Sequence, residues 1–240
     1  VFSVVRGILL RPLAYSDPDR LVAIWPGSFV SNEDLAYWRD RTHSFEQVAG
    51  VSPGWLMSLV VPGSQPLKVT GGRVSDNFFA TLGVSAASGR PIVPGDSMAG
   101  KTGVVVISAA LHEQHFGGDP KVIGRRVQLD GIEHEIVGIM PRGFEFMEPG
   151  TDVWAPLPFN PADPQHRATF SVPFARLRPG ATIQLAQNEL QSLTPTMRAD
   201  LKKTSEWGRE GRVVSLQEAV TGDVRQTLLI LLGAVGTVLL

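Results

Sequence analysis

Residues 126–140 read RVQLDGIEHEIVGIM, and this stretch carries the strongest local folding signal in the chain. Polar and apolar residues alternate on both sides of Asp130-Gly131, as they do in strands with one buried face. An Asp-Gly pair favours the two-residue turns of antiparallel hairpins, because such turns need residues that tolerate a positive φ. The stretch therefore predicts a β-hairpin with strands over Arg126–Leu129 and Glu133–Met140.

The segments around this hairpin predict a compact α+β block. Residues 104–107 form a continuous β-branched run, which indicates a buried strand. Ser108 is a suitable N-cap for a helix reaching Phe116, and two glycines at 117–118 follow as a stop signal. Another strand is expected over residues 153–157. A short helix is expected through Phe78, Phe79 and Leu82, ending at Gly83.

The outer thirds of the chain predict a second group of elements. The expected strands cover residues 21–25, 55–61, 67–74, 170–177 and 212–216, and the expected helices follow the N-caps Ser31 and Thr182. Residues 44–48 are interpreted as one further turn of the first helix. The second helix has apolar residues at three- and four-residue steps as far as Leu201, so one face must be buried. Pro195 should kink this helix or restart it with Thr194 as a new cap.

Both ends of the chain are strongly apolar. The first 15 residues read VFSVVRGILLRPLAY, and residues 227–240 read TLLILLGAVGTVLL without a charge. The second run is shorter than the ~20 residues that a membrane-spanning helix needs. We interpret residues 1–12 and 222–240 as truncated transmembrane helices. The alternative is that both ends are ordinary core elements.

Composition excludes some classes of protein. The net charge is −1, so no long-range positive field attracts nucleic acid or anionic lipid. The chain has no cysteine, which removes disulfides and thiolate metal sites and leaves the redox compartment open.

One motif matches a nucleotide-binding signature by letter. Residues Gly95–Thr102 read GDSMAGKT, which fits the P-loop pattern G-x-x-x-x-G-K-[ST]. A P-loop follows a strand and opens a helix, because the helix N-terminus holds the phosphates. Here a Gly/Pro-rich loop comes first and the predicted strand 104–107 follows. We therefore interpret the match as a surface loop.

No catalytic, cofactor-binding or metal-binding residue is predicted. His112 and His115 flank a glutamate, but the zincin motif spaces its two histidines four apart. These two, and likewise His43, His134 and His166, are interpreted as solvated histidines. No G-x-S-x-G serine-hydrolase motif occurs. The aromatic pairs at 78–79 and at 144 and 146 are interpreted as core.

The order of many short motifs resembles one known family. These motifs are LRPL (10–13), DPDRLV (17–22), SDNFF (75–79), LGV (82–84), GR (89–90), VVIS (105–108), FGGDP (116–120), IG (123–124), LDG (129–131), VGIMP (137–141), GF (143–144), ARLRPGAT (175–182) and GDVR (222–225). Together they resemble the MacB-type periplasmic core domain of ABC transporter permeases. Within the MacB/FtsX-like permeases they are most similar to the acidobacterial duplicated orphan permease group.

The resemblance implies a two-lobed extracytoplasmic domain inserted between two membrane helices. A porter-like lobe would comprise residues 13–74 and 160–221, and a sabre-like lobe, residues 75–159, would be inserted between them. Residues 13–221 would lie on the periplasmic side of the bacterial inner membrane, anchored through both termini. A separate cytoplasmic ABC ATPase, a second permease half or homodimer partner, and a periplasmic partner protein are the implied partners. The family brings no catalytic residues.

Three functions are therefore compared. The first is a non-catalytic permease domain that couples ATP-driven helix motion to export or other periplasmic work. The second is a P-loop nucleotide-binding protein, for which Lys101→Ala would abolish nucleotide binding. The third is a soluble extracytoplasmic binding or adhesion module, which would stay monodisperse without detergent. The substrate, the particular ATPase and the oligomeric state are not encoded in recognisable motifs.

Overall fold

The computed structural model describes residues 15–25, 28–97, 103–158, 169–203 and 212–220. The helical elements are η1 (Pro18–Arg20), α2 (Asn32–Arg41), α3 (Phe78–Leu82), α4 (Ala109–Phe116), η2 (Pro120–Val122) and α6 (Ile183–Asp200). The strands are β1 (Leu21–Ile24), β2 (Val30–Ser31), β3 (Phe45–Val60), β4 (Leu67–Val74), β5 (Ser88–Gly89), β6 (Gly103–Ile107), β7 (Arg126–Leu129), β8 (Ile132–Ile139), β9 (Val153–Pro156), β10 (Phe170–Leu177) and β11 (Val213–Ser215). Residues 216–220 are also helical.

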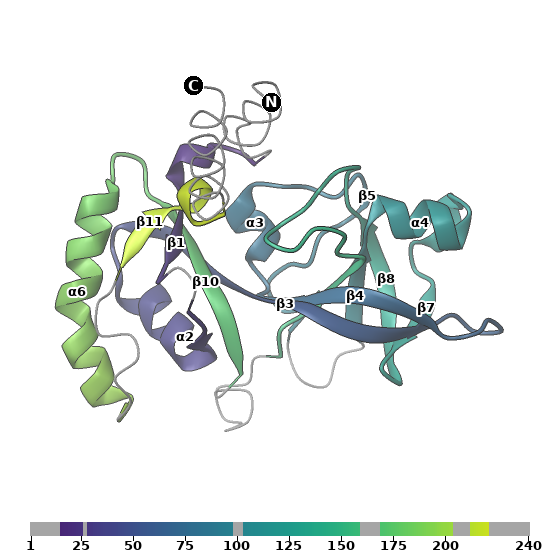
Figure 1. The fold of residues 1–240 in the computed structure, drawn as a ribbon, viewed down its shortest axis with the longest axis horizontal. Coiled ribbons are helices and arrows are strands. Elements are labelled where there is room, and N and C mark those ends of the chain that lie inside the picture. Colours follow the sequence, from purple (N-terminus) through teal and green to yellow (C-terminus); the bar gives the residue numbers. More distant parts are fainter. Residues whose placement is uncertain (1–14, 26–27, 98–102, 159–168, 204–211, 221–240) are drawn as a thin grey trace, which may run out of the picture.

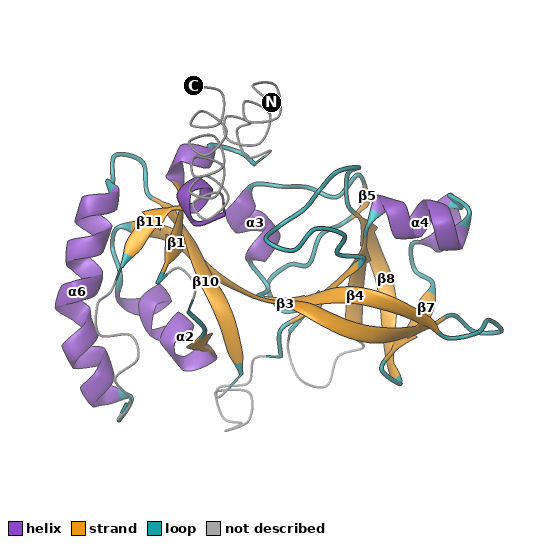
Figure 2. Ribbon diagram, viewed as in Figure 1, coloured by secondary structure: helices purple, strands orange, loops and turns teal. Residues whose placement is uncertain are grey.

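One continuous sheet runs through the described part of the molecule (Figures 1 and 2). The strand order is β11-β1-β10-β3-β4-β9-β6-β8-β5, with β2 paired to β10 and β7 paired to both β3 and β8. Two neighbouring pairs, β4–β9 and β6–β8, are parallel, and the others are antiparallel. Helices α2 and α6 lie near one end of the sheet and α4 near the other (Figure 2). The predicted α+β class is confirmed.

The long strand β3 holds the two ends of this sheet together. Its first half pairs with β10, its second half pairs with β4, and its last two residues pair with β7. The interpretation of residues 44–48 as a helical turn is therefore wrong, because Phe45–Val48 form the start of β3. Their partners, Ala175–Leu177 of β10, are more than 120 residues away, so local sequence patterns do not reveal the pairing.

The hairpin at Asp130-Gly131 is confirmed. Both turn residues have positive φ, 50° at Asp130 and 79° at Gly131, which is the geometry that an Asp-Gly turn favours. The turn also contacts β3, because Asp130 N–H donates to the Ser58 carbonyl at 2.9 Å and the Asp130 carboxylate accepts from Ser58 N–H at 2.8 Å. The turn thus fixes the hairpin against the long strand.

We expect Gly131→Ala to lower the free energy of unfolding by about 1–2 kcal/mol, because a side chain disfavours the left-handed backbone. A Cβ at Gly131 meets no atom within 4 Å, so the backbone alone carries the cost. Gly72→Ala is the matched control, since Gly72 lies in a strand without positive φ and its added Cβ makes only ordinary contacts. Urea unfolding measures both. Equal stability of the two variants would contradict the prediction.

The predicted caps of the longer helices are confirmed. Ser31 and Asp34 form a reciprocal capping box at α2, and the Ser108 and Thr182 hydroxyls cap α4 and α6. Helix α6 runs through Pro195 as one element, so of the two predicted alternatives, a kink or a restart, the restart at Thr194 is wrong. The Thr194 hydroxyl does not act as a cap, because it donates backwards to the Leu190 carbonyl at 2.7 Å.

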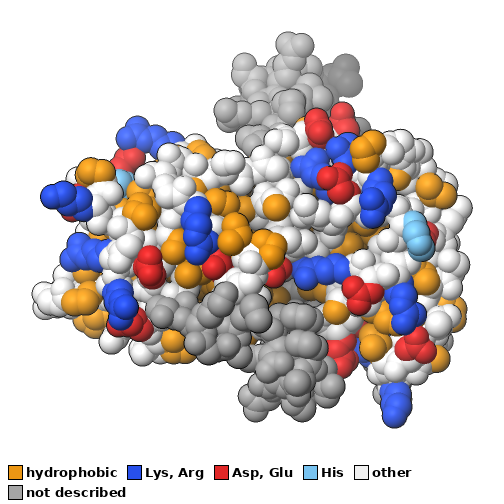
Figure 3. Space-filling model, turned by 180° about the vertical axis from the view of Figure 1, so that it is seen from behind, with side chains coloured by type: hydrophobic (Ala, Val, Ile, Leu, Met, Phe, Trp, Pro, Cys, Tyr) orange, Lys and Arg blue, Asp and Glu red, His pale blue; other side chains and the backbone are white. Residues whose placement is uncertain are grey.

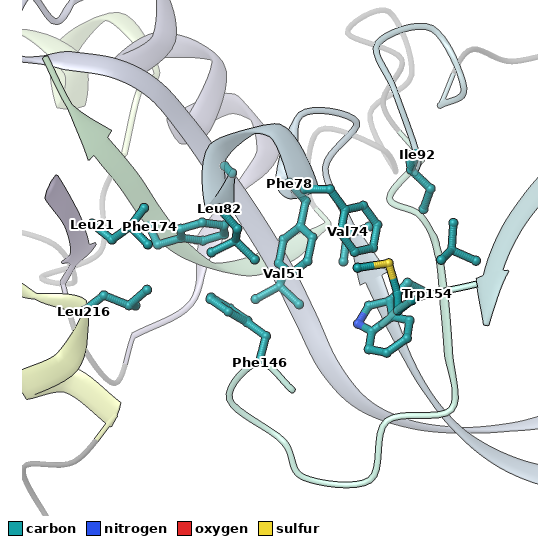
Figure 4. Packing of buried hydrophobic residues seen from close by; sticks show 14 of the residues in the cluster. Leu21, Val51, Val74, Phe78, Leu82, Ile92, Phe146, Trp154, Phe174 and Leu216 are labelled. Carbon is teal, nitrogen blue, oxygen red and sulfur yellow. The ribbon is translucent and has the colours of Figure 1, made fainter. Parts of the chain in front are cut away.

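The buried side chains form three clusters. One lies under α2 and α6, and another surrounds β6, β8 and α4 together with the far half of the β3–β4 pair. The third cluster lies between them and unites residues from distant parts of the chain, among them Leu21, Phe78, Phe146, Trp154 and Leu216 (Figure 4). The predicted burial of Phe78, Phe79 and Phe146 is confirmed.

The apolar ends predicted as membrane helices, residues 1–12 and 222–240, lie outside the described residues. Within the described ranges, no helix is long and apolar enough to cross a membrane.

Candidate functional site: the terminal junction

The described segments nearest the two termini emerge from neighbouring strands. Strands β1 and β11 are antiparallel partners, and Val22 at the start of β1 lies opposite Ser215 at the end of β11. The residues before β1 and after β11 therefore lie at the same end of the sheet, the upper end in Figure 1. We call the set of residues 15–20, residues 81–83 and Arg176 the terminal junction.

Arg176 on β10 is the centre of this junction. The residue is only 6% exposed. Its guanidinium donates to the Thr81 carbonyl at 2.8 Å and to the Ser16 carbonyl at 2.7 Å, with a longer contact of 3.4 Å to the Asp17 carbonyl. Burial lowers the pKa of Arg176 from its ordinary value, and nearby Arg20 adds to this effect. Arg176 thus connects β10, the end of α3 and the segment before β1.

The segment before β1 has further contacts of its own. The Ser16 hydroxyl donates to the Gly83 carbonyl at 2.8 Å, and its N–H donates to the Leu82 carbonyl at 3.2 Å. The Tyr15 hydroxyl donates to the Glu145 carbonyl at 2.6 Å, and burial, with the charge of Glu145 adding to it, raises the pKa of this phenol. This segment is therefore fastened to both α3 and the loop after β8.

Arg20 fastens the same segment to the sheet. Its guanidinium donates twice to the Leu177 carbonyl, at 2.9 and 2.7 Å, and pairs with Glu46 of β3. Three elements distant in sequence, β3, α3 and β10, thus hold the segment that precedes β1. A displacement of this segment must therefore either break these hydrogen bonds and the ion pair or move the three elements with it.

Helix α6 makes polar contacts along α2 and the segment that follows it. The Lys203 ammonium donates to the Ser31 hydroxyl at 3.0 Å and lies 3.4 Å from the Asp34 carboxylate. Asp200 accepts from the Tyr37 hydroxyl at 2.9 Å. The Glu189 carboxylate accepts from the N–H groups that follow α2, at His43 (2.6 Å) and at Ser44 (2.8 Å). These contacts add to the shared apolar cluster and fix the two helices to each other.

The stability supplied by Glu189 should depend on pH. Partial burial opposes ionisation, but the hydrogen bonds from Ser44 and His43 outweigh it, so the pKa of this carboxyl lies below its ordinary value. A lowered carboxyl pKa stabilises the fold above the unfolded-state pKa, and this contribution disappears as pH falls through the folded value. We expect Glu189→Gln to destabilise the chain at pH 7 and to have less effect at pH 3. Thermal unfolding at both values measures it, and an equal loss at both would contradict this account.

The P-loop match has the wrong surroundings for phosphate binding. Gly95, Asp96 and Ser97 are described, whereas 98–102 lie outside the described residues. Asp96 accepts from both terminal nitrogens of Arg90, at 2.6 and 3.1 Å, and from Val93 N–H. Strand β6 begins at Gly103, directly after the match, where a P-loop requires a helix.

The histidines do not assemble into a site. Among the described residues, no group of three His, Asp or Glu side chains could hold a metal ion. His43 is exposed, and His112 and His115 lie on α4, but His134 is only 9% exposed. The interpretation of His134 as solvated is therefore wrong. It packs over Gly103, and its Nδ1 lies 2.9 Å from the Ile132 carbonyl; burial lowers its pKa. His166 lies outside the described residues.

The family model of the MacB-like periplasmic core domain matches residues 1–193. The chain belongs to this family. It is thus a MacB-like periplasmic domain of the ABC transporter permeases. The narrower acidobacterial group stays a prediction. No curated protein matches the chain significantly.

Solved structures share the fold of this MacB-like domain at low sequence identity. The periplasmic region of MacB from Actinobacillus actinomycetemcomitans is 14% identical, with a TM-score of 0.62 over 93% of this chain and 95% of that one. A domain assigned to a permease protein of Porphyromonas gingivalis is 18% identical, with a TM-score of 0.58 over 83% and 90%. The extracellular domain of the noncanonic ABC-type transporter YknZ from Gram-positive bacteria is 13% identical, with a TM-score of 0.57 over 81% and 98%.

No motif of the sequence indicated the terminal junction. Arg176 and Arg20 lie in segments that resemble the family, yet they bond to carbonyl groups 95 and 157 residues away. The only available signal was a charged residue, Arg176, at an inward-facing position of a predicted strand.

Proposed function

We propose that this domain transmits ATP-driven motion of membrane helices to the extracytoplasmic side of an ABC transporter permease, without catalysing a reaction itself. The observation that carries the proposal is the terminal junction. The segment before β1 is fastened to the sheet through Arg176 and Arg20, and the segment after β11 continues directly from the strand that pairs with β1. A helix that moves either segment would therefore pull on the sheet directly.

The continuous sheet supports the proposal that the two lobes move as one rigid body, like a stiff lever. Strands from the proposed porter-like lobe, residues 13–74 and 160–221, pair without interruption with strands of the proposed sabre-like lobe, residues 75–159. The connections are the parallel pair β4–β9 and the pairing of the end of β3 with β7. The far half of β3–β4 also packs with the sabre-like residues, through Met57, Leu59 and Val69.

The proposed partners follow from the family and from the charge pattern. A separate cytoplasmic ABC ATPase would supply the energy, and a second permease half or identical subunit would complete the transporter. A periplasmic protein would receive the motion during export. On the face shown in Figure 3, acidic and basic side chains are interspersed, which gives no uniform positive surface for nucleic acid.

The test uses the complete permease with its ATPase, reconstituted in vesicles that contain acceptor-labelled lipid. These 240 residues contain no cysteine, so in a permease whose remaining cysteines are replaced Gln114→Cys gives a single donor label on α4, and Gln184→Cys gives one on the first turn of α6. We expect energy transfer to the lipid acceptors to change between the nucleotide-free and ATP-bound states. The change should be larger at position 114, which lies farther from the pivot.

A permease paired with an ATPase that cannot bind ATP serves as the control and should show no change at either position. Identical energy transfer in all nucleotide states would overturn the coupling role. ATP hydrolysis by the 240-residue chain alone would overturn the non-catalytic role.

A further inference from the structure

An open hollow lies between the turn after β10 and the first turns of α6. Its volume is about 680 Å³, which is in the range of sites for small ligands or parts of larger ones. Arg178, Leu185, Glu189 and His43 are among the residues that line it. We call it the Arg178 hollow. None of these residues takes part in the terminal junction.

The Arg178 hollow lies at the same end of the sheet as the terminal junction. Leu177, the last residue of β10, lies opposite Phe45, and Arg176 lies opposite Leu21 at the start of β1. The turn that begins at Arg178 is therefore next to η1, whose Arg20 donates to the Leu177 carbonyl, and it lies at the upper end in Figure 1. If the termini lead into the membrane, as the proposed function requires, this end faces the bilayer.

Arg178 supplies the well-exposed charge of the hollow, whereas the Glu189 carboxylate, which also lines it, is mostly buried and hydrogen-bonded. The two Glu189 oxygens accept the backbone N–H groups of His43 and Ser44, and this side chain is only 17% exposed. The His43 side chain is 94% exposed, with its Nδ1 3.3 Å from Glu189. Arg178 is exposed, and among the described residues no carboxylate lies within ion-pair distance of it. The Arg178 guanidinium is thus available to an anion.

An aliphatic surface adjoins this cation. Leu185 lines the same hollow and is 55% exposed. A guanidinium beside an exposed aliphatic side chain matches a phospholipid, whose phosphate pairs with arginine and whose glycerol and upper acyl carbons are apolar.

We propose that the Arg178 hollow binds the phosphate of an anionic phospholipid at the membrane surface, with Arg178 as the main contact and Leu185 beside the glycerol region. This inference rests on the proposed function for its orientation. Lipid binding at this place would hold the turn after β10, and with it the neighbouring terminal junction, at a fixed height above the bilayer.

The test uses the complete permease reconstituted in vesicles, where its membrane helices hold this domain at the bilayer surface. Ser192→Cys carries an environment-sensitive fluorophore at the rim of the hollow; these 240 residues contain no other cysteine, and any cysteine elsewhere in the permease is replaced. We expect a blue shift in vesicles containing phosphatidylglycerol and a smaller one in phosphatidylcholine alone. Arg178→Gln should lower the apparent affinity for phosphatidylglycerol, read from the blue shift, about fivefold. This is the factor expected for one basic side chain at an anionic surface. Arg178→Lys should retain most of the affinity.

Arg126→Gln is the matched control, because Arg126 is an exposed arginine of β7 that pairs with Glu133 and lies outside the hollow. It should leave the response unchanged. A blue shift that inorganic phosphate reproduces in phosphatidylcholine vesicles would overturn the lipid assignment in favour of a free anion. A lipid-attached quencher gives a further outcome. If it quenches the label equally in both kinds of vesicle, and Arg178→Gln has no effect, headgroup binding is overturned and the proposed function stays intact.

Discussion

Arg176→Met is expected to lower the free energy of unfolding by about 2–4 kcal/mol, because it leaves a buried and a partly buried carbonyl oxygen without their charged donor. The carbonyls of Thr81 and Ser16 accept from this guanidinium at 2.8 and 2.7 Å; Thr81 is fully buried and Ser16 lies at the exposed end of the site. Urea unfolding of the chain in detergent measures the loss. Methionine has a similar length, so the lost hydrogen bonds and not a cavity should dominate.

Two further variants make the Arg176 result specific. Arg176→Lys keeps a charged donor but lacks the planar fork that reaches separate carbonyls, so it should recover only part of the stability. Arg126→Met removes an exposed arginine and should change stability by less than about 0.5 kcal/mol. The Ser16 N–H donates to the Leu82 carbonyl. Its hydrogen exchange should become faster in Arg176→Met by more than the loss of global stability alone would cause. Equal stability of Arg176→Met and Arg126→Met would refute the role of Arg176.

Elements with local signals were predictable from the sequence. The hairpin at Asp130-Gly131 and the caps Ser31, Ser108 and Thr182 each depend on residues within a few positions, and each is confirmed. The family resemblance was predictable as well, because it rests on many short motifs in a fixed order.

Features that depend on distant partners were not predictable. The first residues of β3 were interpreted as a helical turn. Their strand partners lie on β10, far away in the sequence, so no local pattern indicated the strand. The burial of His134 depends on its packing over Gly103 of a neighbouring strand. The sequence marks Arg176 only as a charge at an inward-facing strand position and does not identify its acceptors, which belong to α3 and to the segment before β1. The candidate site is made of such long-range contacts. The sequence therefore predicted the family of the domain but not the terminal junction.

Phe78→Ala is expected to lower the free energy of unfolding by about 3–5 kcal/mol, the range for removing a fully buried aromatic ring. Phe78 is 0% exposed, and its ring makes edge-to-face contacts with Phe79 and Phe146 at 5.0 Å and with Phe174 at 5.5 Å (Figure 4). Phe78→Leu should cost less, because leucine fills much of the space. Phe29→Ala is the control, since Phe29 is 48% exposed and its loss should have little effect.

The same variant tests whether the two proposed lobes unfold as one unit. Phe78 lies in the cluster that joins Phe174 of the porter-like lobe to Phe146 of the sabre-like lobe, and the sheet continues between them. Hydrogen exchange should therefore show β1 and β6 losing protection together in Phe78→Ala, because one sheet and one buried cluster join the two lobes. Loss of protection in β6 alone would mean that the lobes unfold separately, and the stiff lever on which the coupling proposal depends would then be wrong.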